Sequence, residues 1–241
     1  METGAARTYV AIVGLLALGG GFASLGQWQL RRAEASGATR AQFADGQTEA
    51  PLAALPTALT EADRFRRVEV RGEYLVQTQF LLDNMLLDGV AGYHVLTPLR
   101  LAGRSEHVLV NRGWVPVGRD RRVLPQVAVG GEPRTVSGKL ERLPRPGLRL
   151  GASSDVSERD EELVVLQYPT ATELRERLGE PLYDYQLLLD PAAAEGYVRD
   201  WQAPGIAPER NLAYAVQWLA LAVCAVAAAL VMAYRTVRRK T

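Results

Sequence analysis

The sequence predicts a membrane-anchored α+β protein in which two transmembrane helices flank a mostly antiparallel β domain. Two observations predict the anchors: residues 8–28 carry no charged side chain, and neither do residues 211–234. As a helix the second run rises about 36 Å, which exceeds the ~30 Å hydrocarbon layer of a bilayer. A third observation predicts the domain, because apolar and polar side chains between the two runs alternate with the period of strands.

The first uncharged run, residues 8–28, is expected to be an uncleaved anchor. A secretory signal peptide is the alternative, and Ala23-Ser24-Leu25-Gly26 weakly resembles a cleavage site. A signal peptide has a shorter apolar core, however, whereas this run continues into Gln27-Trp28-Gln29. That ending is typical of a helix that reaches the membrane interface, so we favour the anchor.

Basic residues predict the orientation of both helices. The last residues of the chain include Arg235, Arg238, Arg239 and Lys240, and basic residues favour the cytoplasmic side of a membrane. With two crossings, residues 1–7 and 235–241 are then cytoplasmic, and residues 29–210 form an extracytoplasmic domain. Arg31 and Arg32 favour the opposite orientation, but long loops are translocated largely regardless of their charge.

Small residues predict that the two anchors contact each other. Gly20 and Ser24 are four residues apart on the first helix, as are Ala225 and Ala229 on the second. Such spacing lets two helix backbones approach closely in lipid. Small residues are equally common in membrane helices that do not pair, so both readings stay open.

Strand patterns follow a stretch rich in Ala, Gly and Thr, residues 33–60, which is expected to be irregular or briefly helical. Val68 and Val70 alternate with charged residues, as in a half-buried strand. Further strands are expected at residues 80–82, 93–101, 108–110, 136–140, 163–166 and 185–189. A turn is expected at Asp83-Asn84, and residues 111–116 are expected to end the buried strand before them.

One helix is predicted inside the domain, between Thr170 and Gly179. Thr170 and Glu173 form a capping-box pattern, and Leu174 and Leu178 fall on one face. Gly179 can adopt the left-handed conformation that ends a helix. Residues 145–160 are rich in Gly, Pro, Ser and charged residues and are expected to form a mobile loop.

The composition argues against several classes of function. A net charge of +1 without a basic stripe argues against nucleic-acid binding. The chain has two histidines and one cysteine, Cys224, so no copper or zinc site is expected. His94 and His107 are interpreted as strand histidines with local hydrogen bonds. No nucleophile-elbow or phosphate-binding glycine motif is found, so we expect no catalytic residues and no enzyme.

Polar and aromatic side chains gather where the two anchors reach the outer membrane face. Six of them are candidate ligand-binding residues: Trp28, Arg31, Arg210, Asn211, Tyr214 and Trp218. The last three, at i, i+3 and i+7, are predicted to share one helix face. An ordinary aromatic belt with a capping Asn explains the pattern as well as a shallow site for a flat amphipathic ligand or a partner helix. In a ligand site the rings would stack on the ligand and Arg would bind its carboxylates.

Five segments together resemble the Surfeit locus protein 1 family. They are residues 26–31, 68–74, 92–99, 108–116 and 211–218, which occur in family order over nearly the whole chain. The most specific of them is Asn-Arg-Gly-Trp-Val-Pro at residues 111–116, because it lies between two membrane spans as it does in the family.

The resemblance implies an assembly factor for haem-copper cytochrome c oxidase in a bacterial plasma membrane. Its partners would be oxidase subunits, chiefly the haem-bearing largest subunit, and bacterial relatives are associated with binding and delivery of haem a. Many relatives carry His at the place of Asn211. Asn is a poor ligand for haem iron, so Tyr214 is an alternative ligand. The alternative function is a two-anchor extracytoplasmic scaffold or binding protein without a cofactor.

Overall fold

The computed structural model describes residues 2–144, 158–160 and 163–238, which divide into two compact units. One unit contains residues 1–42 and 203–241, and the other contains residues 43–202. The helices and strands are α1 (Glu2–Thr48), β1 (Arg67–Tyr74), β2 (Gln79–Leu87), β3 (Val90–Leu101), β4 (His107–Pro116), β5 (Arg134–Arg142), β6 (Glu158–Asp160), β7 (Leu163–Leu166), α2 (Ala171–Leu178), β8 (Leu182–Leu189) and α3 (Pro208–Arg238).

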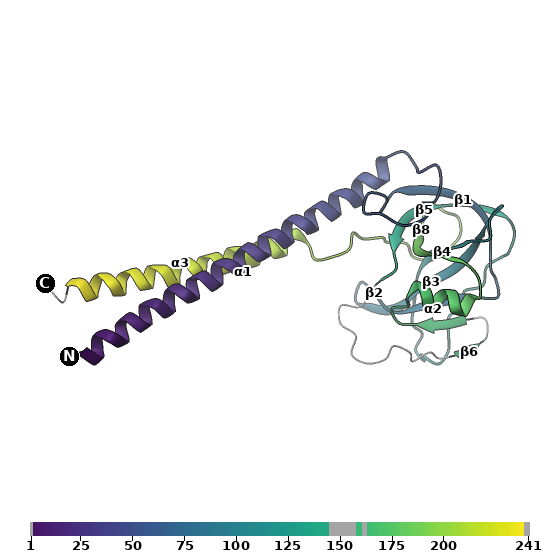
Figure 1. Cartoon of the computed structure of the whole chain (residues 1–241). Helices are drawn as coiled ribbons and strands as arrows, with labels where there is room; N and C mark the ends of the chain where they lie inside the picture. Colours follow the sequence, from purple (N-terminus) through teal and green to yellow (C-terminus); the bar gives the residue numbers. More distant parts are fainter. Residues whose placement is uncertain (1, 145–157, 161–162, 239–241) are drawn as a thin grey trace. The chain divides into compact units, whose positions relative to one another are not determined.

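The first unit is a pair of long helices, α1 and α3 (Figure 1). Both are long and apolar enough to cross a membrane. Their large apolar side chains point outward: Val13, Val216 and Val223 are 66%, 68% and 68% exposed. Outward-facing apolar side chains are what lipid around a helix pair favours, so the predicted membrane-anchored architecture is confirmed.

Helix α1 continues beyond the predicted membrane interface to Thr48. Of the two alternatives expected for residues 33–60, the helical one holds for residues 33–48, and the irregular one holds only for the residues after them. Ala, Gln, Arg and Glu are good helix formers, and together they make up nine of these 16 residues, five of them Ala. Tertiary contacts also hold its end, because the ring of Phe43 packs edge-on against Phe65 with centroids 5.1 Å apart.

The described strands of the second unit form an eight-stranded sheet in the order β1-β5-β8-β4-β3-β2-β7-β6. Strand β1 also pairs with β3, so β1, β5, β8, β4 and β3 close into a barrel. Two pairs, β2–β7 and β4–β8, are parallel, and the other pairs are antiparallel. The prediction of a mostly antiparallel β domain is confirmed.

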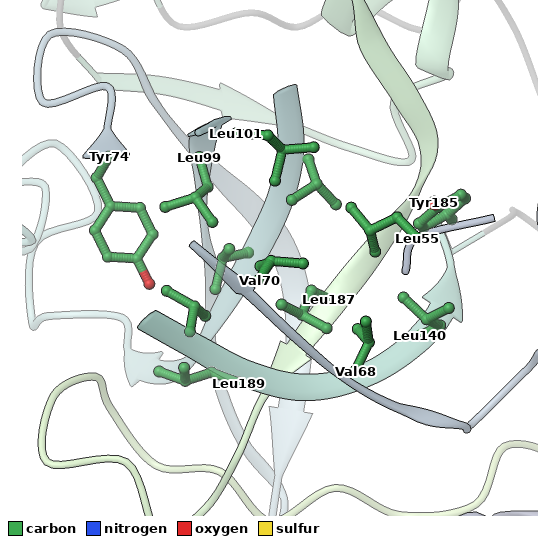
Figure 2. Close-up of a cluster of buried hydrophobic side chains, with 13 residues drawn as sticks. Leu55, Val68, Val70, Tyr74, Leu99, Leu101, Leu140, Tyr185, Leu187 and Leu189 are labelled. Carbon is green, nitrogen blue, oxygen red and sulfur yellow. The ribbon is translucent and has the colours of Figure 1, made fainter. Parts of the chain in front are cut away.

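Alternate side chains of the barrel strands fill its interior. Figure 2 shows Val68 and Val70 of β1 converging with Leu140 of β5 and Leu187 of β8. Tyr185 is fully buried among them, and its hydroxyl donates to the carbonyl of Pro56 at 2.7 Å. Two further apolar clusters lie around Phe80, Leu96, Leu109 and Leu174, and around Leu81, Tyr93 and Val115.

Two predicted strand ends are wrong. Asp83-Asn84 is not a turn, because β2 runs through it with an irregular register between Leu82 and Met85. The turn comes at Asp88-Gly89, where both residues have positive φ, as in a two-residue hairpin loop.

The second wrong strand end is in β4, which does not stop before Asn111 but continues to Pro116. It stays buried as far as Val115. The segment after β8 pairs with it there, through a bridge between Trp114 and Val198. Because Val198 is far from β4 in the sequence, no pattern of residues near β4 predicts this pairing.

Helix α2 has the predicted ends. The hydroxyl of Thr170 accepts a hydrogen bond from the backbone N–H of Glu173 at 3.2 Å, and Gly179 is left-handed with φ 71°. Residues 145–157 of the predicted mobile loop lie outside the described residues, whereas its last residues, Glu158–Asp160, form β6.

Candidate functional site

Small residues line the face of α3 that contacts α1. Ala215, Ala222, Ala225 and Ala229 are each at most 8% exposed. They recur in steps of seven, three and four residues, spacings that keep one face of a helix toward a partner helix. The predicted contact through Ala225 and Ala229 is therefore confirmed.

The facing residues of α1 differ from those predicted. A methyl carbon added at Gly26 would lie 2.8 Å from Leu219 Cγ, and one added at Gly19 would lie 3.2 Å from Val226 Cγ2. At Gly20, by contrast, it would meet nothing within 4 Å. The predicted contact through Gly20 and Ser24 is wrong, because Gly19 and Gly26 are the glycines on the buried face. Together these small residues of α1 and α3 form what we call the seam.

Asn211 lies in the same closed seam and is only 5% exposed. On α1 the Oε1 atom of Gln29 is buried as well, and it has no hydrogen-bond partner in the part of the chain that the structure describes. Gln29 was not among the predicted site residues. Its signal is the spacing Gly19, Phe22, Gly26, Gln29, which follows one face of the helix.

The three residues predicted to share one face of α3 are separated by the packing. Trp218 stacks on Phe22 of α1, with ring centroids 5.6 Å apart and an interplanar angle of 29°. Tyr214 is 47% exposed, whereas Asn211 is buried. The face of α3 that forms the seam contains residues 211, 215, 218 and 222. Tyr214 lies on another face, so its phenol is outside the seam.

The remaining predicted site residues are exposed. Trp28 is 45% exposed, and the guanidinium of Arg32 lies 5.0 Å from its ring centroid. Arg31 and Arg210 are exposed too. Arg210 precedes Tyr214 by four residues, so the two lie one turn apart on α3. Phenolate is a known ligand of haem iron, and guanidinium binds carboxylates, so this exposed pair has donor chemistry that fits haem.

In the β domain, the Asn-Arg-Gly-Trp segment of β4 is packed from both sides. Trp114 is 9% exposed, and its Nε1 donates to the carbonyl of Met85 at 3.0 Å. The guanidinium of Arg112 is buried and donates to the carbonyl of Val127 at 3.0 Å. It also lies 5.2 Å from the ring centroid of Tyr197, in the segment after β8. These contacts hold that segment against β4.

Both histidines lie in strands, as predicted, but their hydrogen-bond partners come from other parts of the chain, so the expectation of local hydrogen bonds is wrong. His107 is 3% exposed, and its Nδ1 lies 3.2 Å from the carbonyl of Pro181. His94 Nδ1 lies 3.3 Å from Nδ2 of Asn111, and burial lowers the pKa of His94 to about 4. Within the described ranges, no group of three or more His, Cys, Asp or Glu side chains could hold a metal ion.

The comparison with known proteins gives a match that includes residues of both units. No curated protein matches the chain. A family match covers residues 16–223, which include most of α1, the whole β domain and the first half of α3. Most of the sequence is thus matched in one continuous range, and the chain belongs to the SURF1 family, a family associated with the assembly of cytochrome c oxidase.

Proposed function

We propose that this protein is an assembly factor for haem-copper cytochrome c oxidase in a bacterial plasma membrane. The observation that carries the proposal is the family match across two apolar helices and the β domain between them. In this role the protein binds and holds oxidase components without acting as an enzyme. Its partners are oxidase subunits, chiefly the largest subunit, which bears the haems.

Gene deletion tests this role. Loss of the gene should lower the amount of assembled oxidase per unit of membrane protein, measured from reduced-minus-oxidised spectra. A plasmid copy should restore it. An unchanged oxidase content in the deletion strain would contradict the proposal.

The proposed orientation places both termini in the cytoplasm and the β domain outside. It is supported by the basic residues that follow the second span, Arg235, Arg238, Arg239 and Lys240. Reporter domains fused after Pro116 and after Thr241 should report opposite sides of the membrane. If both fusions report the same side, the proposed orientation is wrong.

For haem a, we propose contact with the exposed side of α3 rather than with the seam. When bound, haem supplies an iron centre that accepts a phenolate ligand. Tyr214 would offer that oxygen, and Arg210, one turn before it, would bind a propionate carboxylate. Trp28 and Arg31 offer a ring and a cation on α1. The seam is a poor alternative, because Asn211 is buried and a methyl carbon at Gly26 would already contact Leu219.

Two substitutions separate the exposed side from the seam. Tyr214→Phe removes only the phenol oxygen, so it should lower the haem that copurifies from cells making haem a. Asn211→His places imidazole in the seam and should leave the absorption bands unchanged, because the position is closed to a ligand. A gain of haem or a shift to a His-ligated spectrum would mean that the seam admits haem.

The second candidate is a scaffold without a cofactor, and the closed seam around Asn211 favours it. In that case the parent protein carries no haem, yet its deletion still lowers the amount of assembled oxidase. Loss of haem binding in Tyr214→Phe would exclude this candidate.

A further inference from the structure

His94 of β3 ends a chain of polar side chains that crosses three neighbouring strands. Asn111 of β4 and Gln186 of β8 are the other members, and both are buried. The surrounding positions on this side of the sheet are apolar, among them Leu82, Leu96 and Leu109. Buried amides must be hydrogen-bonded, and a fully bonded polar network specifies one arrangement of its members.

The neighbours of each amide determine its orientation. Gln186 Nε2 donates to the carbonyl of Arg142 at 2.9 Å, so Gln186 Oε1 faces Asn111. Asn111 Nδ2 donates to that oxygen at 3.0 Å, and Asn111 Oδ1 accepts from the backbone N–H of Gly113 at 3.2 Å. Both hydrogen bonds of the Asn111 amide group require the same orientation, in which its nitrogen faces His94.

This orientation decides which ring nitrogen of His94 carries the proton. Asn111 Nδ2 lies 3.3 Å from His94 Nδ1 and has only hydrogens to offer. Nδ1 must accept, so the proton lies on Nε2. Burial lowers the pKa of His94 to about 4, which keeps the ring neutral near pH 7.

His107 supplies the internal comparison. Its Nδ1 lies 3.2 Å from the carbonyl of Pro181, which can only accept, so its proton lies on Nδ1. The two histidines of the chain thus have opposite tautomers. His107 is buried in the strand. His94 is only partly buried, and its Nε2 has no hydrogen-bond partner among the residues that the structure describes.

We propose that His94 is a binding residue of the β domain, which presents Nε2–H to a carbonyl or carboxylate oxygen of a partner polypeptide. The ring of Trp201 packs edge-on against the ring of His94, with centroids 5.5 Å apart, and Trp114 is the residue opposite His94 on β4. A fixed donor beside aromatic rings is typical of the central residues of protein interfaces. The same tautomer has no lone pair on Nε2 and cannot coordinate a metal through that atom.

The tautomer is measurable in the full-length protein. The chain should be labelled with ¹⁵N-histidine and purified in detergent through a tag without histidine. Nitrogen spectra distinguish protonated from unprotonated ring nitrogens, and we expect Nε2–H for His94 and Nδ1–H for His107. Asn111→Asp puts a carboxylate, which can only accept, against Nδ1, so the tautomer of His94 should invert. Nδ1–H in the parent protein would overturn the inference.

The binding role rests on the proposed function and is tested with a matched pair of variants. In His94→Gln the amide nitrogen can reach the position of Nε2, whereas in His94→Asn it reaches only that of Nδ1. The Asn variant should capture oxidase subunits roughly two- to tenfold less well than the Gln variant, the effect of losing one hydrogen bond. Capture is normalised to the amount of folded assembly protein in each membrane preparation.

Equal capture by the two folded variants would overturn the binding role. Failure of the proposed function has a different signature: the gene deletion leaves oxidase content unchanged. If deletion lowers oxidase content while the Gln and Asn variants behave alike, only the assignment of His94 is wrong.

Discussion

The helix unit and the β domain bury opposite kinds of side chain. In the helix unit, Ala215 and Ala229 are at most 1% exposed, whereas Val223 is 68% exposed. In the β domain the buried residues are large, and Phe80 and Leu109 are both fully buried. In the helix unit the buried side chains are distinguished by their small size. In the β domain they are distinguished by their low polarity.

The difference reflects the solvent around each unit. In water, burying a large apolar side chain is favourable by about 1.5–3 kcal/mol, so large residues fill the core. In lipid the tails are as apolar as Leu, so that driving force is absent and close backbone packing takes its place. Glycine and alanine allow that approach, which is why they occupy the seam between α1 and α3.

The largest effect that sharpens this comparison is expected from Trp114→Ala. Loss of a buried aromatic side chain costs about 3–5 kcal/mol of unfolding free energy. Trp114→Ala should therefore lower the thermal stability of the β domain and the amount of protein in membranes. Trp28→Ala is the matched control, because Trp28 is 45% exposed on α1. Equal losses of stability and abundance in the two variants would contradict the contrast between the β domain and the helix unit. Normal abundance of Trp114→Ala together with loss of assembled oxidase would indicate a direct functional role of Trp114.

The next effect is a pH dependence confined to the β domain. The pKa of His94 is lowered from 6.5 to about 4 by burial, so between these values the unfolded chain binds a proton that the folded chain does not. Stability therefore falls as pH falls through this window, by roughly 3 kcal/mol in all. The measurement is urea unfolding from neutral pH to about pH 4.

His94→Gln is the control for this pH dependence, since glutamine does not titrate. The parent should lose more stability on acidification than the variant does. Parallel losses would show that other groups, not His94, cause the acid sensitivity.

The smallest effect is expected in the seam. Gly26→Val places a side chain against Leu219 and should weaken the contact between the helices by about 1–2 kcal/mol. Gly20→Val is the control, because a methyl carbon there meets nothing within 4 Å.

A methyl carbon at Gly19 would lie 3.6 Å from Ala225 Cβ, a separation that suits a disulfide. Oxidation of Gly19→Cys with Ala225→Cys, in a Cys224→Ala background, reports the contact. If Gly26→Val and Gly20→Val slow the formation of this disulfide equally, Gly26 is not in the seam.

The sequence by itself determined the features that depend on neighbouring residues. Uncharged runs long enough for a bilayer identify both anchors, because charge is costly in lipid at any position of the run. The alternation around Val68 identifies β1, and Thr170, Glu173 and Gly179 identify both ends of α2, because strand period and helix caps are local geometry.

Only the tertiary structure decided which residues of separate elements meet. A helix with many small residues offers several faces, so Gly19 and Gly26 could be told from Gly20 and Ser24 only by packing against α3. His94, Asn111 and Gln186 lie on three different strands, the last of them far along the chain, and their pairing sets the tautomer of His94. The physical reason is that side-chain contacts between elements depend on rotation and register, and residue spacing along one element does not determine either of them.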